Sequence, residues 1–244
     1  MARFFVDGLP KEGSEYELTG ENLAHAKVLR LNPGEQIMLC DGKGSESACK
    51  VLSGGASVVL RAGAPVPCPA EPKAKVSVWI AFPKADKAEH VIQKAVELGA
   101  AELVLFPSRY CVSRPEGKAL DKKLERWQKI ARAAAEQSRR GVIPGVRPAG
   151  SFSEALKEAA AADLPILFYE NETGYSLHDA LEETAAAPAT ISLMTGAEGG
   201  VSEEESATAK AAGMTICTLG PRILRCETAP LAGLTAIMYA LGEM

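Results

Sequence analysis

The sequence predicts an α/β protein: a parallel sheet with helices on both faces, preceded by a small β-rich domain. Three observations predict this fold. From about residue 75 onward, apolar strand-like segments alternate with helical patterns, which is typical of a covered parallel sheet. The segment before residue 61 instead carries short apolar runs separated by glycines, which favours strands and turns. Four prolines fall within residues 61–75, a pattern typical of a linker.

The N-terminal part reads as four strands and one short helix. The expected strands lie at 3–6, 35–44, 47–52 and 57–62, and the expected helix lies at 20–30. With the proline-rich stretch as the boundary, we expect one domain over residues 1–70 and a second over residues 74–244.

The C-terminal part reads as strands and helices in alternation. We expect strands at 75–82, 102–106, 164–169, 190–195 and 214–219, and helices at 84–100, 119–140, 153–161, 176–185, 202–212 and 229–242. Apolar residues at helical spacing support the first of these helices, with Gly99 as its stop. Ser202 and Glu205 form the pattern of a capping box at the start of another helix.

Composition narrows the class of protein. Of the 244 residues, 47% are hydrophobic and 24% are charged, an ordinary globular profile. No apolar run approaches the roughly 20 residues of a membrane span. Asp7, Gly8 and Pro10 interrupt the opening segment, so we expect no secretion signal and a cytoplasmic protein. The six cysteines form no C-x-x-C pair and the three histidines are isolated, so we expect no metal site.

Charge is distributed unevenly along the chain. Residues 73–150 carry 16 Lys and Arg against 8 Asp and Glu, whereas residues 151–244 carry 4 against 14. A basic middle third indicates a local face that binds a polyanion. A solvated helix with internal ion pairs explains the same excess equally well.

Three loops follow neighbouring strands of the expected sheet, at 168–174, 195–200 and 219–228. In open α/β sheets, ligands collect beyond the carboxyl ends of the strands. In the second loop Gly196, Gly199 and Gly200 allow close approach of backbone to a ligand. The loop matches neither a dinucleotide fingerprint nor a phosphate-binding P-loop. A tight turn before a capped helix remains the alternative interpretation.

The third loop, with its neighbours, reads LGPRILRCETAPLAGL over residues 219–234. It places Arg222, Arg225 and Glu227 among apolar residues that we expect to be buried, where charge must be paired or used. Two guanidinium groups beside a glycine turn can hold a polyanion or a polar base. A structural ion pair between Arg225 and Glu227 is the alternative.

These motifs together resemble a known family. The segments that carry the resemblance are RFFV, HAKVLRLNPGEQIMLCDGKG, FPKADKAEHVIQKAVELGA, SRYCVSRP, RWQKIARAAAEQSRRGVIP, TGAEGGVSEEE and LGPRILRCETAPLAGL. In this order they resemble the bacterial 16S ribosomal RNA uridine-N3 methyltransferases of the knotted SPOUT superfamily. The resemblance extends over essentially the whole chain.

The resemblance implies a PUA-like β-barrel that helps to hold RNA, followed by a SPOUT α/β domain with a C-terminal trefoil knot. It implies a homodimer that uses S-adenosyl-L-methionine to methylate uridine N3 in 16S rRNA of the small ribosomal subunit. The cofactor pocket of the family maps onto Tyr169, Glu170, Gly196, Gly199, Gly200, Leu219, Gly220, Ile223 and Leu224.

Uridine N3 lies on the Watson–Crick edge, so the target must be unpaired or flipped. We hypothesise that Arg222 and Arg225 stabilise charge on the uracil oxygens or hold the flanking phosphate. Glu198 or Glu227 is then either the proton acceptor or a group that orients an arginine. Further contacts to rRNA are expected from Arg30, Lys84, Lys94, Gln137 and Arg140.

Three alternatives stay open at this stage. The chain could encode a SPOUT enzyme that methylates a ribose 2′-hydroxyl, or a non-catalytic RNA-binding protein of ribosome assembly. An unrelated nucleotide-binding enzyme is disfavoured by the missing phosphate-loop patterns.

The sequence departs from the family pattern at three positions. Ala197 and Val201 stand in place of the usual proline and aromatic residue, which predicts looser loop packing. Tyr110 stands where arginine is common, which predicts one weaker RNA contact.

Overall fold

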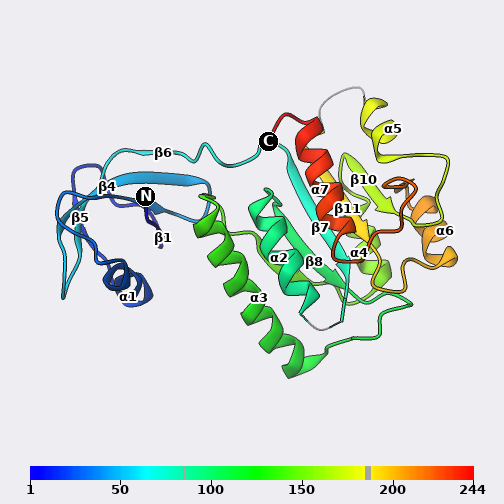
Figure 1. Cartoon of the computed structure of the whole chain (residues 1–244), viewed down its shortest axis with the longest axis horizontal. Coiled ribbons are helices and arrows are strands. Elements are labelled where there is room, and N and C mark those ends of the chain that lie inside the picture. The colour runs from blue at the N-terminus through cyan, green and yellow to red at the C-terminus, as the bar shows by residue number, and fades with distance from the viewer. Residues whose placement is uncertain (85, 185–187) are drawn as a thin grey trace. The chain divides into compact units, whose positions relative to one another are not determined.

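The structure, a computed structural model, describes residues 1–84, 86–184 and 188–244. The chain forms two compact units, whose elements are labelled in Figure 1. Met1–Glu71 and Ala135–Ile143 make up the N-terminal unit, and Pro72–Ala134 with Pro144–Met244 make up the C-terminal unit. A stretch from the middle of the sequence therefore belongs to the N-terminal unit, which no sequence pattern predicts.

The N-terminal unit is built on a six-stranded sheet. Its elements are β1 (Arg3–Phe5), β2 (Glu15–Glu17), α1 (Gly20–Leu29), β3 (Gln36–Cys40), β4 (Ser45–Ser53), β5 (Val59–Arg61) and β6 (Pro65–Pro67). The strand order is β1-β3-β4-β5-β2, with β6 beside β4. Strand β1 runs parallel to β3, and the other pairs are antiparallel. Phe4, Leu18, Ile37, Leu39 and Leu60 are completely buried in its core.

The expected linker at 61–75 is partly a strand. Strand β6 pairs antiparallel with Ser45–Ser47 of β4. Pro65 and Pro67 lack an N–H, so this segment can serve only as a sheet edge, and its three residues are exposed. The proline pattern predicted the absence of a helix correctly but not the edge pairing.

The C-terminal unit contains the parallel sheet that the sequence predicts. Its strands are β7 (Lys75–Ala81), β8 (Glu102–Phe106), β9 (Gly145–Pro148), β10 (Leu164–Phe168), β11 (Thr190–Thr195) and β12 (Thr215–Cys217). The order is β12-β10-β11-β7-β8-β9, and every pair is parallel. The nearly continuous apolar sequences of β8 and β10 fit strands whose two faces are covered. The strands expected at 102–106 and 190–195 are confirmed.

Helices cover this sheet. They are α2 (Lys87–Glu97), α3 (Gly117–Gln137), α4 (Phe152–Ala159), α5 (Leu177–Glu182), α6 (Glu203–Ala211) and α7 (Ala229–Ala240). Helices α2 and α7 contact each other, and α7 packs on β7 and β11 in front of the sheet in Figure 1. Helix α4 packs on β8 and β11. Gly233 of α7 has no room for a Cβ, because the ring of Phe168 occupies that place. Helix α7 therefore lies directly on the end of β10.

The helices of this unit end one to three residues earlier than expected, α3 and α5 among them. Helix α3 stops at Gln137 rather than at residue 140, and Arg139 has a left-handed backbone with a φ of 64°. A left-handed residue cannot continue an α-helix, so the chain turns there. Helix α5 stops at Glu182, and the last residue of the helix expected at 176–185 lies outside the described residues.

Strands β2 and β9 were not predicted. They have three and four residues respectively, which is too short for an alternating pattern to identify. The capping box of α6 is confirmed: the Ser202 hydroxyl accepts a hydrogen bond from the Glu205 backbone, and the Glu205 carboxylate accepts one from the Ser202 backbone.

Candidate active site

Three loops meet at one edge of the C-terminal sheet. Strands β12, β10 and β11 are neighbours in the sheet and parallel, so their carboxyl ends point the same way. The loops that follow them line a single cavity of about 720 Å³. This is the size range of sites for small-molecule ligands and cofactors.

The cavity collects most of the residues that the sequence singled out. Every residue expected at a cofactor lines it, together with two arginines and one glutamate of the catalytic hypothesis: Tyr169, Glu170, Gly196, Glu198, Gly199, Gly200, Leu219, Gly220, Arg222, Ile223, Leu224 and Arg225. Glu227 does not line the cavity, but its carboxylate pairs with Lys87, which does. Lys87, which also lines it, was not predicted as a site residue.

The glycine turn at 196–200 is shaped for close backbone approach. Gly200 has a φ of 72°, and its N–H donates to the Ala197 carbonyl at 3.0 Å. A Cβ on Gly200 would overlap the Glu170 carboxylate, which accepts a hydrogen bond from the Val201 N–H at 3.1 Å. The glycine turn is thus held to the loop after β10 through one carboxylate.

The predicted loosening of this turn is not seen in its burial. Ala197 and Val201 are 4% and 6% exposed, so both side chains are packed. Tyr110 lies against Gly199, where an added Cβ would come within 2.6 Å of the tyrosine Cβ. Tyr110 therefore borders the glycine turn, and its own side chain is half-exposed.

Thr195, the last residue of β11, has a hydroxyl without a partner. The residue is 2% exposed and lines the cavity, and its Oγ1 makes no hydrogen bond among the described residues. An unpaired buried hydroxyl is unfavourable by about 1–3 kcal/mol. A polar ligand group in the cavity would satisfy it.

Arg222 and Arg225 are exposed, which corrects the expectation that they lie among buried residues. The neighbouring Ile223 is also 85% exposed, because the apolar run forms a surface turn rather than a core segment. Within the described part of the chain neither guanidinium has an ion pair or a side-chain hydrogen bond. In particular, the alternative ion pair between Arg225 and Glu227 does not form.

Both glutamates of the catalytic hypothesis are instead paired with Lys87. The Lys87 Nζ lies 3.2 Å from Glu198 Oε1 and 3.1 Å from Glu227 Oε2. All three side chains are roughly one-quarter exposed. Cys226 completes the cluster: its thiol donates to Glu227 Oε2 at 3.2 Å and lies 3.6 Å from Lys87 Nζ.

In this cluster the pKa values of the two glutamates are lowered and the pKa of Lys87 is raised. A hydrogen bond from its own backbone N–H, followed by the Lys87 ammonium, lowers the pKa of Glu227 to about 2. Burial acts to raise the pKa of Glu198, but backbone N–H groups, one of them from Lys84, and Lys87 outweigh it and lower the pKa overall. Hydrogen bonds to Glu227 and then Glu198 raise the pKa of Lys87. The cluster is therefore one ammonium between two carboxylates near neutral pH.

Burial, and then the contact with Glu227, raise the pKa of the Cys226 thiol to about 11. A thiol with so high a pKa stays protonated near neutral pH, and the thiolate is the reactive form of cysteine. Cys226 is therefore a hydrogen-bond donor to Glu227 rather than a nucleophile.

The residues expected to contact RNA are distributed over both units. Arg30 is exposed at the end of α1, with a φ of 55°, and Gln137 is exposed at the end of α3. Lys84 is exposed, and its backbone N–H donates to Glu198 Oε1 at 2.9 Å. Lys94 is partly buried and pairs with Glu97 at 2.9 Å. Of these four, Lys84 is the residue held beside the cavity.

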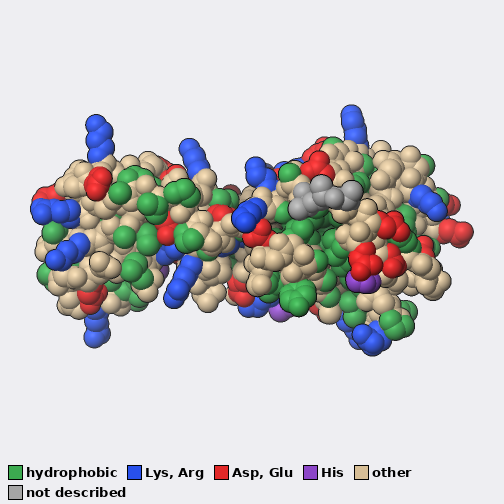
Figure 2. Space-filling model, turned by 90° about the horizontal axis from the view of Figure 1, so that it is seen from above, with side chains coloured by type: hydrophobic (Ala, Val, Ile, Leu, Met, Phe, Trp, Pro, Cys, Tyr) green, Lys and Arg blue, Asp and Glu red, His purple; other side chains and the backbone are tan. Residues whose placement is uncertain are grey.

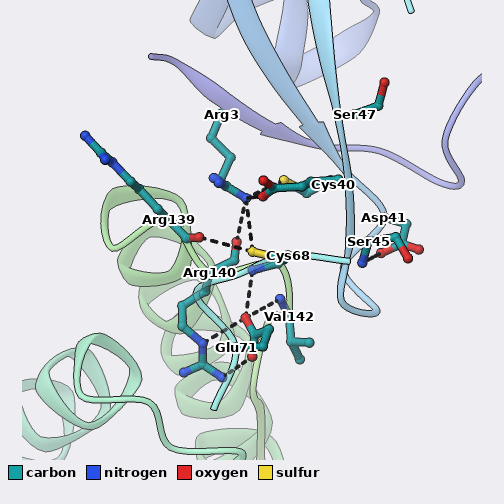
Figure 3. A network of polar contacts seen from close by, with 12 residues as sticks. Arg3, Cys40, Asp41, Ser45, Ser47, Cys68, Glu71, Arg139, Arg140 and Val142 are labelled. Carbon is teal, nitrogen blue, oxygen red and sulfur yellow. Dashed lines mark hydrogen bonds and ion pairs between the residues drawn. The ribbon is translucent and has the colours of Figure 1, made fainter. Parts of the chain in front are cut away.

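Arg140 does not fit the role of an exposed phosphate ligand. Its side chain is 4% exposed and pairs with Glu71, with Nη2 to Oε2 at 2.8 Å and Nε to Oε1 at 3.0 Å. Figure 3 shows this pair beside Arg3 within the N-terminal unit. Glu71 also accepts from the backbone of Gly141 and Val142 at 2.7 and 3.0 Å. The Glu71 carboxylate therefore holds residues 140–142 to the first segment of the N-terminal unit.

Acidic side chains gather on part of the C-terminal unit on the face shown in Figure 2.

In the parts of the chain that the structure describes, no group of three or more His, Cys, Asp or Glu is arranged to hold a metal ion. Among the same residues, no helix has the length and apolar character needed to cross a membrane.

Comparison with known proteins connects this site to a family. Residues 70–238 match the model of an RNA methyltransferase domain, and residues 18–60 match that of an RNA methyltransferase PUA domain. Ribosomal RNA small subunit methyltransferase E of Bacillus subtilis is 34% identical over 253 residues, covering 98% of this chain and 96% of that protein. The protein of the same name from Mycobacterium bovis is 35% identical, covering 96% and 90%.

A solved structure agrees with these sequence matches. The crystal structure of ribosomal RNA small subunit methyltransferase E from Neisseria gonorrhoeae, bound to S-adenosyl methionine, is 30% identical. It aligns with a TM-score of 0.86 and covers 98% of this chain and 97% of that one. The resemblance expected from the sequence is confirmed: the chain belongs to the RNA methyltransferase family and carries the PUA domain of these proteins.

Proposed function

We propose that this protein transfers a methyl group from S-adenosyl-L-methionine to N3 of a uridine in 16S rRNA of the small ribosomal subunit. The observation that carries the proposal is the single cavity formed by the loops after β10, β11 and β12. It unites a glycine turn with two arginines that have no acidic partner among the described residues.

The residues present fit the cofactor. Gly196 and Gly200 line the cavity, and without side chains they present only backbone to it. Such a lining offers amide and carbonyl groups to a flat, polar ligand. The Thr195 hydroxyl is buried without a partner at the same place. When bound, the cofactor supplies an electrophilic methyl group on a sulfonium. Tyr169, Glu170, Gly199, Leu219, Gly220, Ile223 and Leu224 complete the proposed pocket.

Arg222 and Arg225 are proposed to act on the RNA. Removal of the N3 proton leaves negative charge on the uracil oxygens, and preorganised guanidinium groups stabilise such charge. Their exposure lets them meet a nucleotide that has been extruded from its stack. An exposed guanidinium without an internal partner is also suited to hold the flanking phosphate.

Glu198 and Glu227 are weak candidates for the proton acceptor. An efficient general base has a pKa near the working pH, whereas both carboxylates have lowered pKa values and are held by Lys87. The alternative in which they orient an arginine has no support either, because among the described residues both glutamates pair with Lys87 and neither pairs with an arginine. Charge stabilisation by the two arginines is then the main contribution of the chain to proton removal.

Further parts of the proposal follow from the resemblance. We assign residues 1–70, together with residues 135–143, to an RNA-binding PUA-like β-barrel, and the rest of residues 74–244 to a SPOUT domain with a C-terminal trefoil knot. Arg30, Lys84, Lys94 and Gln137 are proposed RNA contacts. We also propose a cytoplasmic homodimer; the exposed Tyr239, at 76%, supplies apolar surface for it. Light scattering of the purified protein tests the dimer.

The function is tested by incubating the protein with labelled cofactor and small ribosomal subunits that lack the modification. Digestion followed by mass spectrometry should identify 3-methyluridine at one position. A ribose-methylated nucleoside would replace this proposal with 2′-O-methylation. Binding of rRNA with no cofactor binding by calorimetry would instead identify a non-catalytic assembly protein.

A further inference from the structure

Lys87 occupies an unusual place in the site. It is the first residue of α2, and its ammonium lies between carboxylates from two different loops. Glu198 belongs to the turn after β11, at 3.2 Å, and Glu227 precedes α7, at 3.1 Å. A lysine ammonium carries three donors on one compact charge. It can therefore serve two carboxylates at once.

The pairing has a consequence for the neighbouring arginines. Glu198, Arg222 and Arg225 line the same cavity, and Glu227 is only two residues from Arg225 in the chain. Without Lys87, two carboxylates would lose their ionic partner at the cavity whose lining includes two unpaired arginines. Ion pairs between the freed carboxylates and these exposed guanidinium groups are the expected result, because opposite charges attract even near a protein surface.

A second consequence concerns the charge that RNA meets. Lys87, Glu198 and Glu227 together carry one net negative charge, whereas the two glutamates alone would carry two. Phosphates approaching Arg222 and Arg225 would be repelled by unpaired carboxylates. The lysine therefore both occupies the acidic groups and reduces the negative charge at the cavity.

We propose that Lys87 is a positioning residue that sequesters Glu198 and Glu227 and so keeps Arg222 and Arg225 available to RNA. This inference rests on the proposed function, since it takes RNA as the ligand of the arginines. It assigns Lys87 no contact with the reacting atoms. It also gives the two glutamates a defined partner in place of an open role.

The first test replaces Lys87 with methionine, which keeps the length of the side chain but removes its charge. RNA affinity should fall by about tenfold, the order expected when an arginine contact is lost. The slope of log affinity against log salt should fall by about one for each guanidinium withdrawn from phosphate. In turnover, the KM for RNA should rise and kcat should fall, because the captured arginines are the groups proposed to stabilise charge on the uracil oxygens. Binding of S-adenosyl-L-methionine should stay close to that of the wild type.

The decisive test replaces the two glutamates with neutral glutamines in the variant that already lacks the lysine. In the triple variant Lys87→Met, Glu198→Gln, Glu227→Gln, no carboxylate is left to capture the arginines, so RNA affinity and salt slope should return toward wild type. If Lys87 itself gripped RNA, or only tied the loops together, the triple variant would stay as weak as the single one and the proposal would be overturned. Lys87→Arg, which retains the charge, should bind RNA nearly as well as wild type.

Lys157→Met supplies the matched control, because Lys157 is an exposed lysine of α4 and is expected to leave RNA binding unchanged. Thermal unfolding checks that every variant is folded. RNA binding is measured without cofactor, and methyl transfer by the wild type is measured in parallel. Loss and recovery of binding with no methyl transfer would support the role of Lys87 and refute the proposed function. Methyl transfer with no effect of Lys87→Met on RNA binding would do the reverse.

Discussion

Arg140 and Arg225 look alike in the sequence and differ in the structure. Each stands near a glycine and close to a second arginine, and the sequence suggested RNA for both. Arg140 is 4% exposed and paired with Glu71. Arg225 is exposed, and the described residues offer it no ionic partner. The difference teaches that the distance to a carboxylate and the degree of burial decide the role of an arginine, not its immediate neighbours.

The physical reason is the free energy of desolvation. A guanidinium withdrawn from water must be paired, and breaking such a pair leaves an uncompensated charge. A guanidinium left in water has no such requirement and can exchange water for phosphate. The Glu71 pair therefore contributes to folding, whereas the two cavity arginines are available for binding.

The largest expected effect is on stability, from Glu71→Ala. Removing this carboxylate takes the bidentate partner from a buried guanidinium and the acceptor from two backbone N–H groups, and should destabilise the protein by about 3–5 kcal/mol. The control is Glu15→Ala, which breaks a pair with Arg61 whose side chains are 63% and 58% exposed; it should change stability by about 1 kcal/mol or less. Urea unfolding measures both. Equal effects would contradict the distinction between the two kinds of ion pair.

The next largest effect is on catalysis, from Arg225→Ala. Removing one preorganised charge-stabilising group typically lowers kcat by about 10²–10³-fold, while an exposed substitution should change stability by about 0.5 kcal/mol or less. Methyl transfer and thermal unfolding give the two numbers. Arg225→Lys keeps the charge without the planar fork and should fall between. Full activity of the alanine variant would remove Arg225 from the site.

A smaller effect is expected from two hydroxyls on strand β11, of which Ser192 has a hydrogen-bond partner and Thr195 has none among the described residues. Thr195→Val replaces a hydroxyl without a partner, so it should stabilise the free protein by about 1 kcal/mol and weaken cofactor binding by about the value of one hydrogen bond. Ser192 is the control: its hydroxyl donates to the Ala159 carbonyl at 2.6 Å, so Ser192→Ala should destabilise. Thermal unfolding with and without cofactor distinguishes these outcomes. Equal losses of stability in Thr195→Val and Ser192→Ala would contradict the absence of a hydrogen-bond partner for the Thr195 hydroxyl.

The smallest expected effect is on the pH dependence of stability. Burial acts to raise the pKa of Glu71, but Arg140 and two backbone N–H groups outweigh it and lower the pKa from the usual value of a glutamate. The folded state thus holds the carboxylate ionised. Its contribution is present above the unfolded pKa and is lost as pH falls through the folded pKa. Unfolding measured from about pH 6 to about pH 3 should show a steeper loss in wild type than in Glu71→Gln. Parallel curves would contradict this.

The parts of the fold that could be predicted are those encoded by local pattern. The strand at 102–106 contains the apolar run LVLF, the strand at 190–195 contains Ile191, Leu193 and Met194, and the Ser202–Glu205 capping box lies within four residues. The glycine turn at 196–200 follows a strand directly. Because adjacent parallel strands end at one edge, the meeting of the three loops could be anticipated from these local signals.

The ion pairs of Arg140 and Lys87 could not be predicted, because each joins residues far apart in the chain. Nothing near Arg140 indicates Glu71, and nothing near Glu198 or Glu227 indicates Lys87. The exposure of Ile223 was likewise hidden, since an apolar run in a surface turn has the same letters as one in the core. Strand β6 was missed because its prolines indicate an interruption and not the edge of a sheet.

Residues 135–143 give the architecture a further consequence. The polypeptide leaves its first unit after Glu71, returns at Ala135 and leaves again after Ile143. A gene fragment ending at codon 71 would encode that glutamate without the guanidinium that neutralises it. Recombination at a single crossover therefore cannot transplant the N-terminal module intact. The two halves have to be inherited together.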